Sequence, residues 1–251
     1  MIVLHDMRIL PNSTEILPLT LTADKIQVWQ FDLCLPPERL MMLAATLSAN
    51  ERARASRFRL SAHQNRFIAA RGLLRELLGT YLHRPATALR FGQGPHGKPL
   101  LIGKEASAGL YFNLSHSGNR ALYVLAQQEV GVDIEYFDRK VDYLAVAAQI
   151  CTTREQAMLQ AQSSTQLPHA FFTCWTRKEA LAKALGSGLT SDLHQFDVCS
   201  HENVLSPHRT SLRDTTGQEW SVLNIPMEPG WFGAVAAAGT DWQPYCHWEV
   251  A

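Results

Sequence analysis

Apolar and polar residues follow two different periods along this chain. An alternation with a period of two, typical of a half-buried strand, is found in seven segments. These segments are residues 25–33, 110–118, 121–135, 196–200, 220–225, 231–239 and 243–250, with a turn around 127–129 inside the third. The segments at 196–200, 220–225 and 231–239 predict antiparallel strands, and the segment at 243–250 predicts a final one.

A period of 3.6 predicts helices in the remaining patterned segments, which are residues 38–47, 65–82 and 170–188. Two capping boxes mark further helix starts, because a Ser or Thr followed three residues later by Glu satisfies two free amide groups. The first is Ser48 with Glu51, and the second is Thr152 with Glu155.

Helices and strands recur twice along the chain in mixed order. This recurrence predicts an α+β fold made of two similar α/β halves, because each set of elements can build its own layered core. We place the boundary at the turn near residue 128, so the predicted halves are residues 1–128 and 129–251.

Composition narrows the class of protein. With 251 residues and 46% apolar residues, the chain is long and apolar enough to bury a sizeable core. Its 23 basic and 23 acidic residues cancel, which argues against a nucleic-acid partner. The five cysteines are scattered and odd in number, as expected of reduced thiols in a cytoplasmic protein. A signal peptide and a run of 18 apolar residues are both absent, so we expect no membrane partner.

The first chemical signal is the segment "GVDIE". Asp133 and Glu135 share one face of the predicted strand, about 6.6 Å apart, while Val132 and Ile134 share the other. Two neighbouring carboxylates repel each other unless water, a proton or a cation separates them. An exposed face with two solvated acids is therefore one interpretation, and a cation site is the other.

A second signal lies on the predicted helix 170–188. Glu179 and Lys183 are four residues apart and share one face, on the same stripe as Trp175. A surface ion pair of this kind contributes only about 0.2–0.5 kcal/mol. The neighbouring aromatic residue predicts that this face is at least partly covered, so a functional role stays open beside the surface pair.

Several residues could bind an anion. Ser115 and His116 are adjacent on a predicted strand and face opposite ways, so they cannot form a nucleophile–base pair, but both can donate to phosphate oxygens. Arg54 lies in an arginine-rich stretch, and Lys98 lies in the tight turn "PHGKP". Arg71 lies on an apolar helix, where an arginine usually needs an anionic partner.

A site that contains both carboxylates and phosphate needs a hard cation between them. Mg²⁺ favours one to three carboxylates together with phosphate oxygens and water. Asp133 and Glu135 are therefore most simply explained as half of a magnesium site for a phosphate-bearing substrate.

Three segments, "FNLSHSG", "GVDIE" and "WTRKEALAKALGSGL", occur in this order. Together they resemble the signatures of the surfactin-type 4′-phosphopantetheinyl transferases, and the similarity extends from about residue 47 to residue 198. The resemblance implies a pseudo-twofold α+β monomer with coenzyme A bound in the cleft between its halves. It also implies the reaction, in which the phosphopantetheine arm of coenzyme A moves to a serine of an acyl or peptidyl carrier protein and adenosine 3′,5′-bisphosphate is released.

The resemblance also implies roles for the C-terminal half. Asp133, Glu135 and Glu179 would hold Mg²⁺ on the pyrophosphate, and Glu179 would act as general base toward the carrier serine. Lys183 would neutralise the pyrophosphate and the leaving group. Asp133, Glu179 and Lys183 are thus the predicted catalytic residues.

The predicted coenzyme contacts lie mainly in the first half. Arg54, Ser115 and His116 would line the 3′-phosphate region, and Arg71 resembles a phosphate-contacting position of longer relatives. Gly97, Lys98 and Pro99 would lie near the adenine end. A second basic residue of the arginine-rich helix contacts the 3′-phosphate in some relatives, and the matching position here is either Glu51 or Arg52.

Two alternatives stay open at this level. An acidic strand followed by a Glu and a Lys on a helix also suits a Mg²⁺-dependent nuclease or phosphatase, although the neutral charge and the complete signature count against it. The other alternative is a degenerate homologue that only binds carrier proteins. The sequence does not identify the carrier's pathway, which could be fatty-acid, polyketide or non-ribosomal peptide synthesis.

Overall fold

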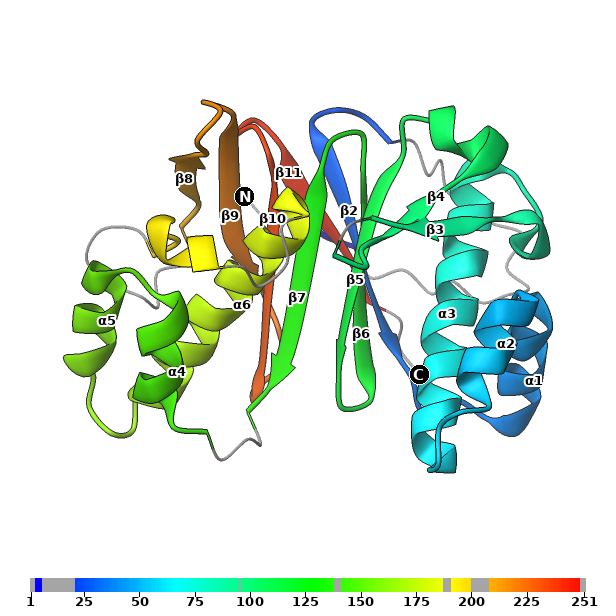
Figure 1. Cartoon of the computed structure of the whole chain (residues 1–251), viewed down its shortest axis with the longest axis horizontal. Helices are drawn as coiled ribbons and strands as arrows, with labels where there is room; N and C mark the ends of the chain where they lie inside the picture. Colours follow the sequence, from blue (N-terminus) through cyan, green and yellow to red (C-terminus); the bar gives the residue numbers. More distant parts are fainter. Residues whose placement is uncertain are drawn as a thin grey trace.

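The computed structural model of the chain describes residues 3–5, 21–94, 96–137, 141–186, 191–199 and 208–248. Two groups of helices lie at opposite ends of the molecule, with the sheets between them (Figure 1). The predicted mixed α+β fold is confirmed, because each group of helices covers a sheet of its own. None of the described helices has the length and apolar character needed to cross a membrane.

The first sheet has the strand order β1-β11-β2-β6-β5. Its strands are β1 (Val3–His5), β11 (Gln243–Trp248), β2 (Lys25–Asp32), β6 (Arg120–Ala126) and β5 (Tyr111–Ser117). Its helices are α1 (Pro37–Thr46), α2 (Ala49–Ala55) and α3 (Ser61–Leu82). A small hairpin of β3 (Phe91–Gln93) and β4 (Pro99–Leu101) follows, flanked by the short 3₁₀ helices η1 (Ala86–Ala88) and η2 (Gly103–Ser107).

The second sheet has the order β7-β10-β9-β8, with all neighbours antiparallel. Its strands are β7 (Val130–Tyr136), β10 (Trp231–Ala238), β9 (Glu219–Ile225) and β8 (Thr210–Arg213). Its helices are α4 (Tyr143–Ile150), α5 (Thr153–Gln160) and α6 (Leu167–Leu185), followed by the 3₁₀ helix η3 (Ser191–Gln195).

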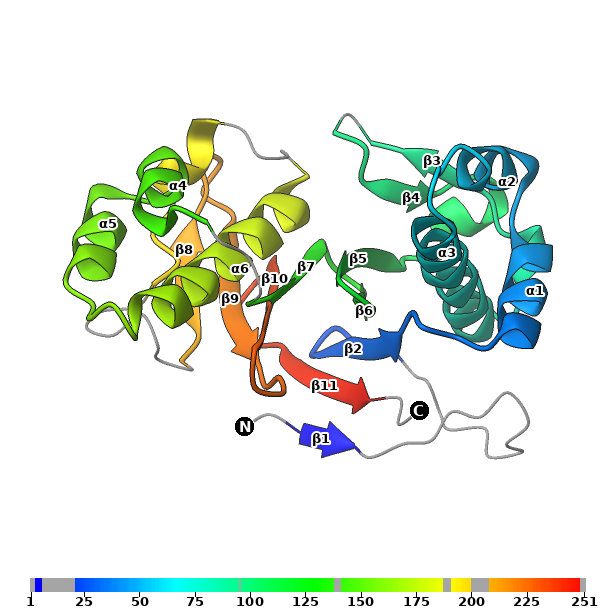
Figure 2. The same ribbon diagram turned by 90° about the horizontal axis from the view of Figure 1, so that it is seen from below.

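The two sheets share one apolar core. Val28 and Leu122 of the first sheet pack in the same cluster as Val132, Ile134 and Val235 of the second, and all five are almost fully buried. Each such side chain contributes about 1.5–3 kcal/mol through burial, so the halves are held together by more than their connecting chain. The chain also returns at its end, since β11 inserts between β1 and β2 of the first sheet (Figure 2).

Most predicted elements are present. Both capping boxes form, with Ser48 and Thr152 each accepting from the backbone amide of the Glu three residues later. The helix predicted at 65–82 begins earlier, at Ser61, and the one predicted at 170–188 begins at Leu167 and ends at Leu185, before Gly186 in the left-handed region. The positions 187 and 188 lie outside the described residues.

The strand predicted at 196–200 is wrong for the described part of that segment. Residues 196–199 form no strand, although Val198 and Cys199 are buried as the alternation requires. The Val198 amide donates to the Glu155 carboxylate at 2.7 Å, so a side chain takes the place of a neighbouring strand. The final strand, β11, is present but runs parallel to both β1 and β2.

Candidate active site

Strand β7 places its two acids on one face, as its alternation predicts. Val132 and Ile134 are buried in the shared core, and Asp133 and Glu135 lie on the opposite face. Asp133 is only 3% exposed. The interpretation of two solvated acids is therefore wrong for Asp133, because a buried carboxylate needs partners inside the protein.

Strand β5 supplies partners for this face of β7. The two strands belong to different sheets, and side chains connect them. Asn113 Oδ1 accepts from the Val132 amide at 3.1 Å, Ser115 Oγ donates to Asp133 at 2.7 Å, and Ser117 Oγ donates to Glu135 at 2.9 Å. These three side chains alternate along β5, so the "SHS" segment uses both serines to hold the acids.

Gly131 lets helix α6 lie directly on β7. A Cβ added at this position would stand 2.1 Å from the Ala180 carbonyl oxygen and 2.4 Å from the Ala184 amide nitrogen. No side chain fits that gap without displacing backbone. The glycine of "GVDIE" therefore sets the height of α6 above the acids, and α6 carries Glu179 and Lys183.

Lys183 joins the helix to the acidic strand. Its Nζ lies 2.7 Å from Asp133 Oδ1 and 2.9 Å from Ser115 Oγ. The surface pair with Glu179 is thus replaced by a bridge to β7. The second oxygen of Asp133, Oδ2, is buried and has no hydrogen-bond partner among the described residues.

Glu179 has a strongly shifted pKa. Burial, followed by the nearby charge of Asp133, raises its pKa to about 7, with Glu135 adding to the rise and Lys183 opposing it. A carboxyl group with a pKa near neutrality can accept a proton from a substrate hydroxyl at physiological pH. A cation placed among the three acids would lower this pKa and so favour the ionised carboxylate.

The cluster fits a hard divalent cation in ligand type and charge. Asp133, Glu135 and Glu179 offer carboxylate oxygens, which Mg²⁺ prefers, and the buried Oδ2 of Asp133 is an acceptor in need of a partner. The three carboxylates do not lie within 4.8 Å of one another, as expected of like charges that repel.

Among the described residues, three possible ligand atoms lie within 4.8 Å of one another in a different cluster, formed by Cys151, Glu155 and Cys174. The Glu155 oxygens already accept from the amides of Thr152 and Val198 and pair with Lys178. The five cysteine thiols are free, and hydrogen bonds with neighbouring thiols and burial raise the pKa of Cys174 well above its usual range. This cluster therefore belongs to the packed core, not to a metal site.

A pocket of about 640 Å³ opens beside the carboxylates. It collects basic side chains from α2, α3, β5 and α6, and the turn of the β3–β4 hairpin. Of the predicted contacts, those that line it are Arg54, Arg71, Gly97, Pro99, Ser115, His116 and Lys183. Segments far apart in sequence thus converge on one space of the size that a nucleotide-like ligand needs.

Lys98 is the predicted contact that does not line this pocket. Its ammonium instead lies 2.9 Å from the Glu129 carboxylate and 3.1 Å from the Val130 carbonyl oxygen. Sequence reasoning also missed Arg66, which lines the pocket one turn of α3 away from His63. Arg66 was visible only as one of several arginines, because the pattern does not show which side of a helix faces a ligand.

Arg71 is a cation held largely away from water, and His116 is an imidazole that lines the same pocket from an exposed position of β5. Burial lowers the pKa of Arg71, and its Nη1 is buried without a hydrogen-bond partner among the described residues. Glu51 lies 4.0 Å from Arg71 and pairs more closely, at 2.7 Å, with Arg75. Burial, Lys183 and Arg66 together lower the pKa of His116. An anion bound in this pocket would give Arg71 a hydrogen-bond partner and would stabilise the protonated form of His116.

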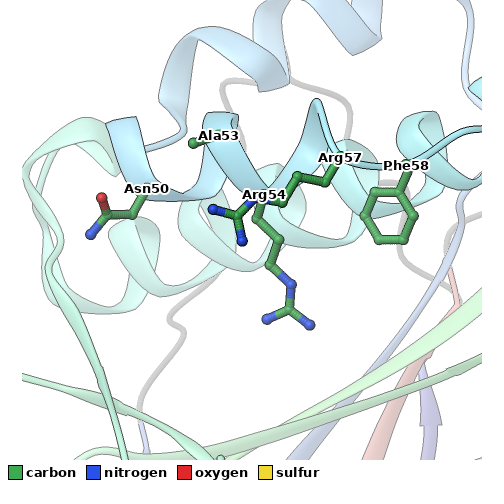
Figure 3. A pocket seen from close by; sticks show the side chains of 5 residues that line it. All are labelled: Asn50, Ala53, Arg54, Arg57 and Phe58. Atoms are coloured by element: carbon green, nitrogen blue, oxygen red, sulfur yellow. The ribbon is translucent and has the colours of Figure 1, made fainter.

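Glu51 and Arg52 have different surroundings in the structure. Glu51 belongs to the capping box and the Arg75 ion pair, whereas Arg52 is exposed and donates to the Leu47 carbonyl oxygen. Neither residue lines the pocket. A second hollow, of about 690 Å³, lies along α2 and shares Arg54 and Phe58 with it (Figure 3). The Asn50, Ala53 and Arg57 side chains complete its lining.

Comparison with known proteins gives two family matches that meet at one residue. Residues 36–129 match the 4′-phosphopantetheinyl transferase N-terminal family, and residues 129–235 match the 4′-phosphopantetheinyl transferase superfamily. The chain is 37% identical to the 4′-phosphopantetheinyl transferase HetI of Nostoc sp., over 90% of this chain and 93% of that protein.

Two further relatives carry the same family name. A putative 4′-phosphopantetheinyl transferase of Synechocystis sp. is 35% identical over 71% of this chain and 71% of that protein. The 4′-phosphopantetheinyl transferase Sfp of Bacillus subtilis is 26% identical over 78% of this chain and 84% of its own length. With the matches covering both halves, the chain belongs to the 4′-phosphopantetheinyl transferase family and is a transferase.

Proposed function

We propose that this enzyme transfers the 4′-phosphopantetheine arm of coenzyme A to a serine hydroxyl of an acyl or peptidyl carrier protein. The observation that carries the proposal is the meeting of two sets of charges. The charges of Asp133 and Glu135 act on Glu179, and Lys183, which bonds to Asp133, also lines a pocket that contains Arg54 and Arg71.

The pocket suits the adenosine 3′-phosphate end of coenzyme A. Arg54, Arg71 and His116 supply donors for phosphate oxygens, and Arg66 adds a further cation. Ser115 lines the same pocket, but its hydroxyl already donates to Asp133. The backbone at Gly97 and Pro99 forms a wall without long side chains, where a flat base can approach closely. The ammonium of Lys98 does not take part in this binding.

The carboxylates would hold a magnesium ion. Asp133, Glu135 and Glu179 are the residues that would bind Mg²⁺, with the unpaired Oδ2 of Asp133 as one donor. When bound, the ion supplies positive charge that neutralises the pyrophosphate oxygens and the leaving group. Ser115 and Ser117 keep Asp133 and Glu135 in place through their hydrogen bonds.

The reaction needs a base and a cation at the pyrophosphate. The serine oxygen attacks the phosphorus that bears the pantetheine arm, and the bond from that phosphorus to the bridging oxygen breaks. Glu179 accepts the hydroxyl proton as the general base. Lys183, which is 28% exposed, can reach the pocket and donate to the oxygens that gain charge as adenosine 3′,5′-bisphosphate leaves.

The proposal extends to the organisation of the protein. Residues 1–128 would carry the coenzyme contacts, and residues 129–251 would carry the magnesium site and the catalytic helix. A monomeric state, a cytoplasmic location and a role in fatty-acid, polyketide or non-ribosomal peptide synthesis stay predictions from the sequence.

The test is a transfer assay with purified protein, coenzyme A, Mg²⁺ and a panel of apo-carriers, read by mass spectrometry. We expect at least one carrier to gain the mass of the phosphopantetheine arm, and the gain to stop when a chelator is added. Binding without a mass gain on any carrier would favour the degenerate homologue. Cleavage of a phosphodiester substrate instead would favour the nuclease alternative.

A further inference from the structure

Lys98 lies at the point where the two halves of the molecule approach each other. It directly precedes β4 in the hairpin whose turn is closed by hydrogen bonds from the Gly94 amide to the Lys98 carbonyl oxygen and from the Gly97 amide to the Gly94 carbonyl oxygen. In Figure 2 this hairpin extends from the first half toward the C-terminal end of α6. The side chain of Lys98 bridges that approach.

The Lys98 ammonium has three acceptors, all in the second half. It lies 2.9 Å from the Glu129 carboxylate, 3.1 Å from the Val130 carbonyl oxygen and 3.4 Å from the Ala184 carbonyl oxygen. A lysine ammonium has three N–H donors, so these contacts use its capacity. The group has no donor left for a phosphate or a base.

The acceptors explain why a cation is favourable here. Ala184 lies in the last turn of α6, where carbonyl oxygens have no partner within the helix and the helix dipole is negative. Val130 begins β7 next to Gly131, the residue whose missing side chain lets Ala180 and Ala184 approach the strand. Lys98 thus holds the junction of α6 and β7 from the opposite half.

We propose that Lys98 is a positioning residue that fixes the hairpin wall of the coenzyme pocket to the end of the catalytic helix. Its neighbours Gly97 and Pro99 line the pocket, and Lys183, which precedes Ala184, lines the same pocket from α6. The brace therefore sets the spacing between the wall and the Lys183 ammonium. This role differs from the direct coenzyme contact that the sequence resemblance implies.

The first measurement uses the protein without any ligand and does not depend on the proposed function. Hydrogen exchange of residues 182–185 is followed in the wild type, in Lys98→Met and in Lys104→Met. Lys104 is an exposed lysine of η2 in the same half, so its variant is a matched control for the loss of charge. We expect exchange to speed up about tenfold in Lys98→Met alone, as for the loss of a hydrogen bond to a charged group. Unchanged exchange in Lys98→Met would overturn the brace.

The second measurement rests on the proposed function and uses steady-state transfer kinetics. Lys98→Met should raise the KM for coenzyme A several-fold and also lower kcat, because both the wall and the catalytic helix lose their spacing. Lys98→Arg keeps a cation at this position and should recover most of both losses. Glu129→Ala removes an acceptor that does not line the pocket, and it should shift KM in the same direction by a smaller factor.

The two measurements separate the possible failures. If Glu129→Ala keeps the wild-type KM while Lys98→Met does not, Lys98 contacts the coenzyme directly and the brace is wrong. If the wild type transfers nothing to any carrier, the proposed function fails, and the exchange experiment still decides the brace.

Discussion

Helix α6 carries two lysine–carboxylate pairs that differ in their surroundings. Lys178 pairs with Glu155 at 2.6 Å, and both side chains are fully buried. Lys183, five residues later, pairs with Asp133 at 2.7 Å, but its side chain is 28% exposed. The pairs have similar lengths, so distance alone does not distinguish a structural pair from a functional one.

The difference lies in how completely each pair is satisfied. Lys178 also donates to the carbonyl oxygens of Leu193 and Phe196, and the Glu155 oxygens accept from two backbone amides. The second pair is incomplete, since Asp133 keeps a buried oxygen without a partner among the described residues. A complete pair stabilises the fold, and an incomplete pair beside a pocket leaves capacity for a ligand.

The largest effect should come from breaking the complete pair. Lys178→Met leaves the buried Glu155 charge without its counter-ion, so the free energy of unfolding should fall by about 3–5 kcal/mol. Lys183→Met should cost less than half of this, because its position is open to the pocket and Ser115 still donates to Asp133. Urea denaturation of both variants measures the difference, and equal losses would show that the two pairs are alike.

Substitutions at the incomplete pair and its neighbour Glu179 should instead have the largest effect on turnover. Asp133→Ala, Glu179→Gln and Lys183→Met should each lower turnover by roughly two orders of magnitude or more, because each removes a group that acts on the pyrophosphate or the serine proton. The Glu179→Gln variant should also lose the acidic limb of the pH–rate profile. Transfer kinetics at saturating coenzyme A measure these losses, and near-normal turnover in Asp133→Ala at limiting Mg²⁺ would contradict the metal site.

A smaller effect concerns the pH dependence of stability in a chelator, where no ion neutralises the acids. The folded pKa of Glu179 is raised from 4.5 to about 7, so the folded state holds this proton more tightly than the unfolded state does. Stability present below pH 4.5 is therefore lost as the pH rises toward 7. The Glu179→Gln variant has no titrating group at this position. As the pH rises from 4.5 to 7, its free energy of unfolding should therefore increase by about 1–3 kcal/mol relative to that of the wild type. Parallel stability curves for the two proteins would refute the assignment.

Sequence patterns predicted the local parts of this comparison well. The alternation in β7 placed Asp133 and Glu135 on one face, and the helical period of α6 placed Glu179 and Lys183 on one side, because both periods are properties of the backbone. The capping box at Thr152 was predicted for the same reason, because it depends on residues close in sequence.

The contacts between residues far apart in sequence could not be predicted from the sequence patterns. The partner of Lys183 is 50 residues away in sequence, and the spacing of Glu179 and Lys183 pointed to the wrong pair. The segment 196–199 alternates like a strand but bonds through the Glu155 side chain, and a single-sequence pattern does not reveal such a partner. The role of Gly131 depends on the close approach of α6, which only the folded structure shows.

The smallest predicted effect tests whether the serines of β5 serve the incomplete pair. Ser117 donates to Glu135 at 2.9 Å and accepts from the Tyr136 amide at 3.2 Å, so Ser117→Ala should cost about 0.5–1.5 kcal/mol of stability. Turnover should fall only several-fold, because Glu135 stays in place but is less firmly oriented. Ser211→Ala, at an exposed position of the edge strand β8, is the matched control and should change neither quantity. If Mg²⁺ titrations show the same dependence of rate in Ser117→Ala and the wild type, Ser117 supports the strand junction alone. A weaker apparent Mg²⁺ affinity in Ser117→Ala would instead link this hydrogen bond to the metal ligand, since a less firmly oriented carboxylate binds an ion less tightly.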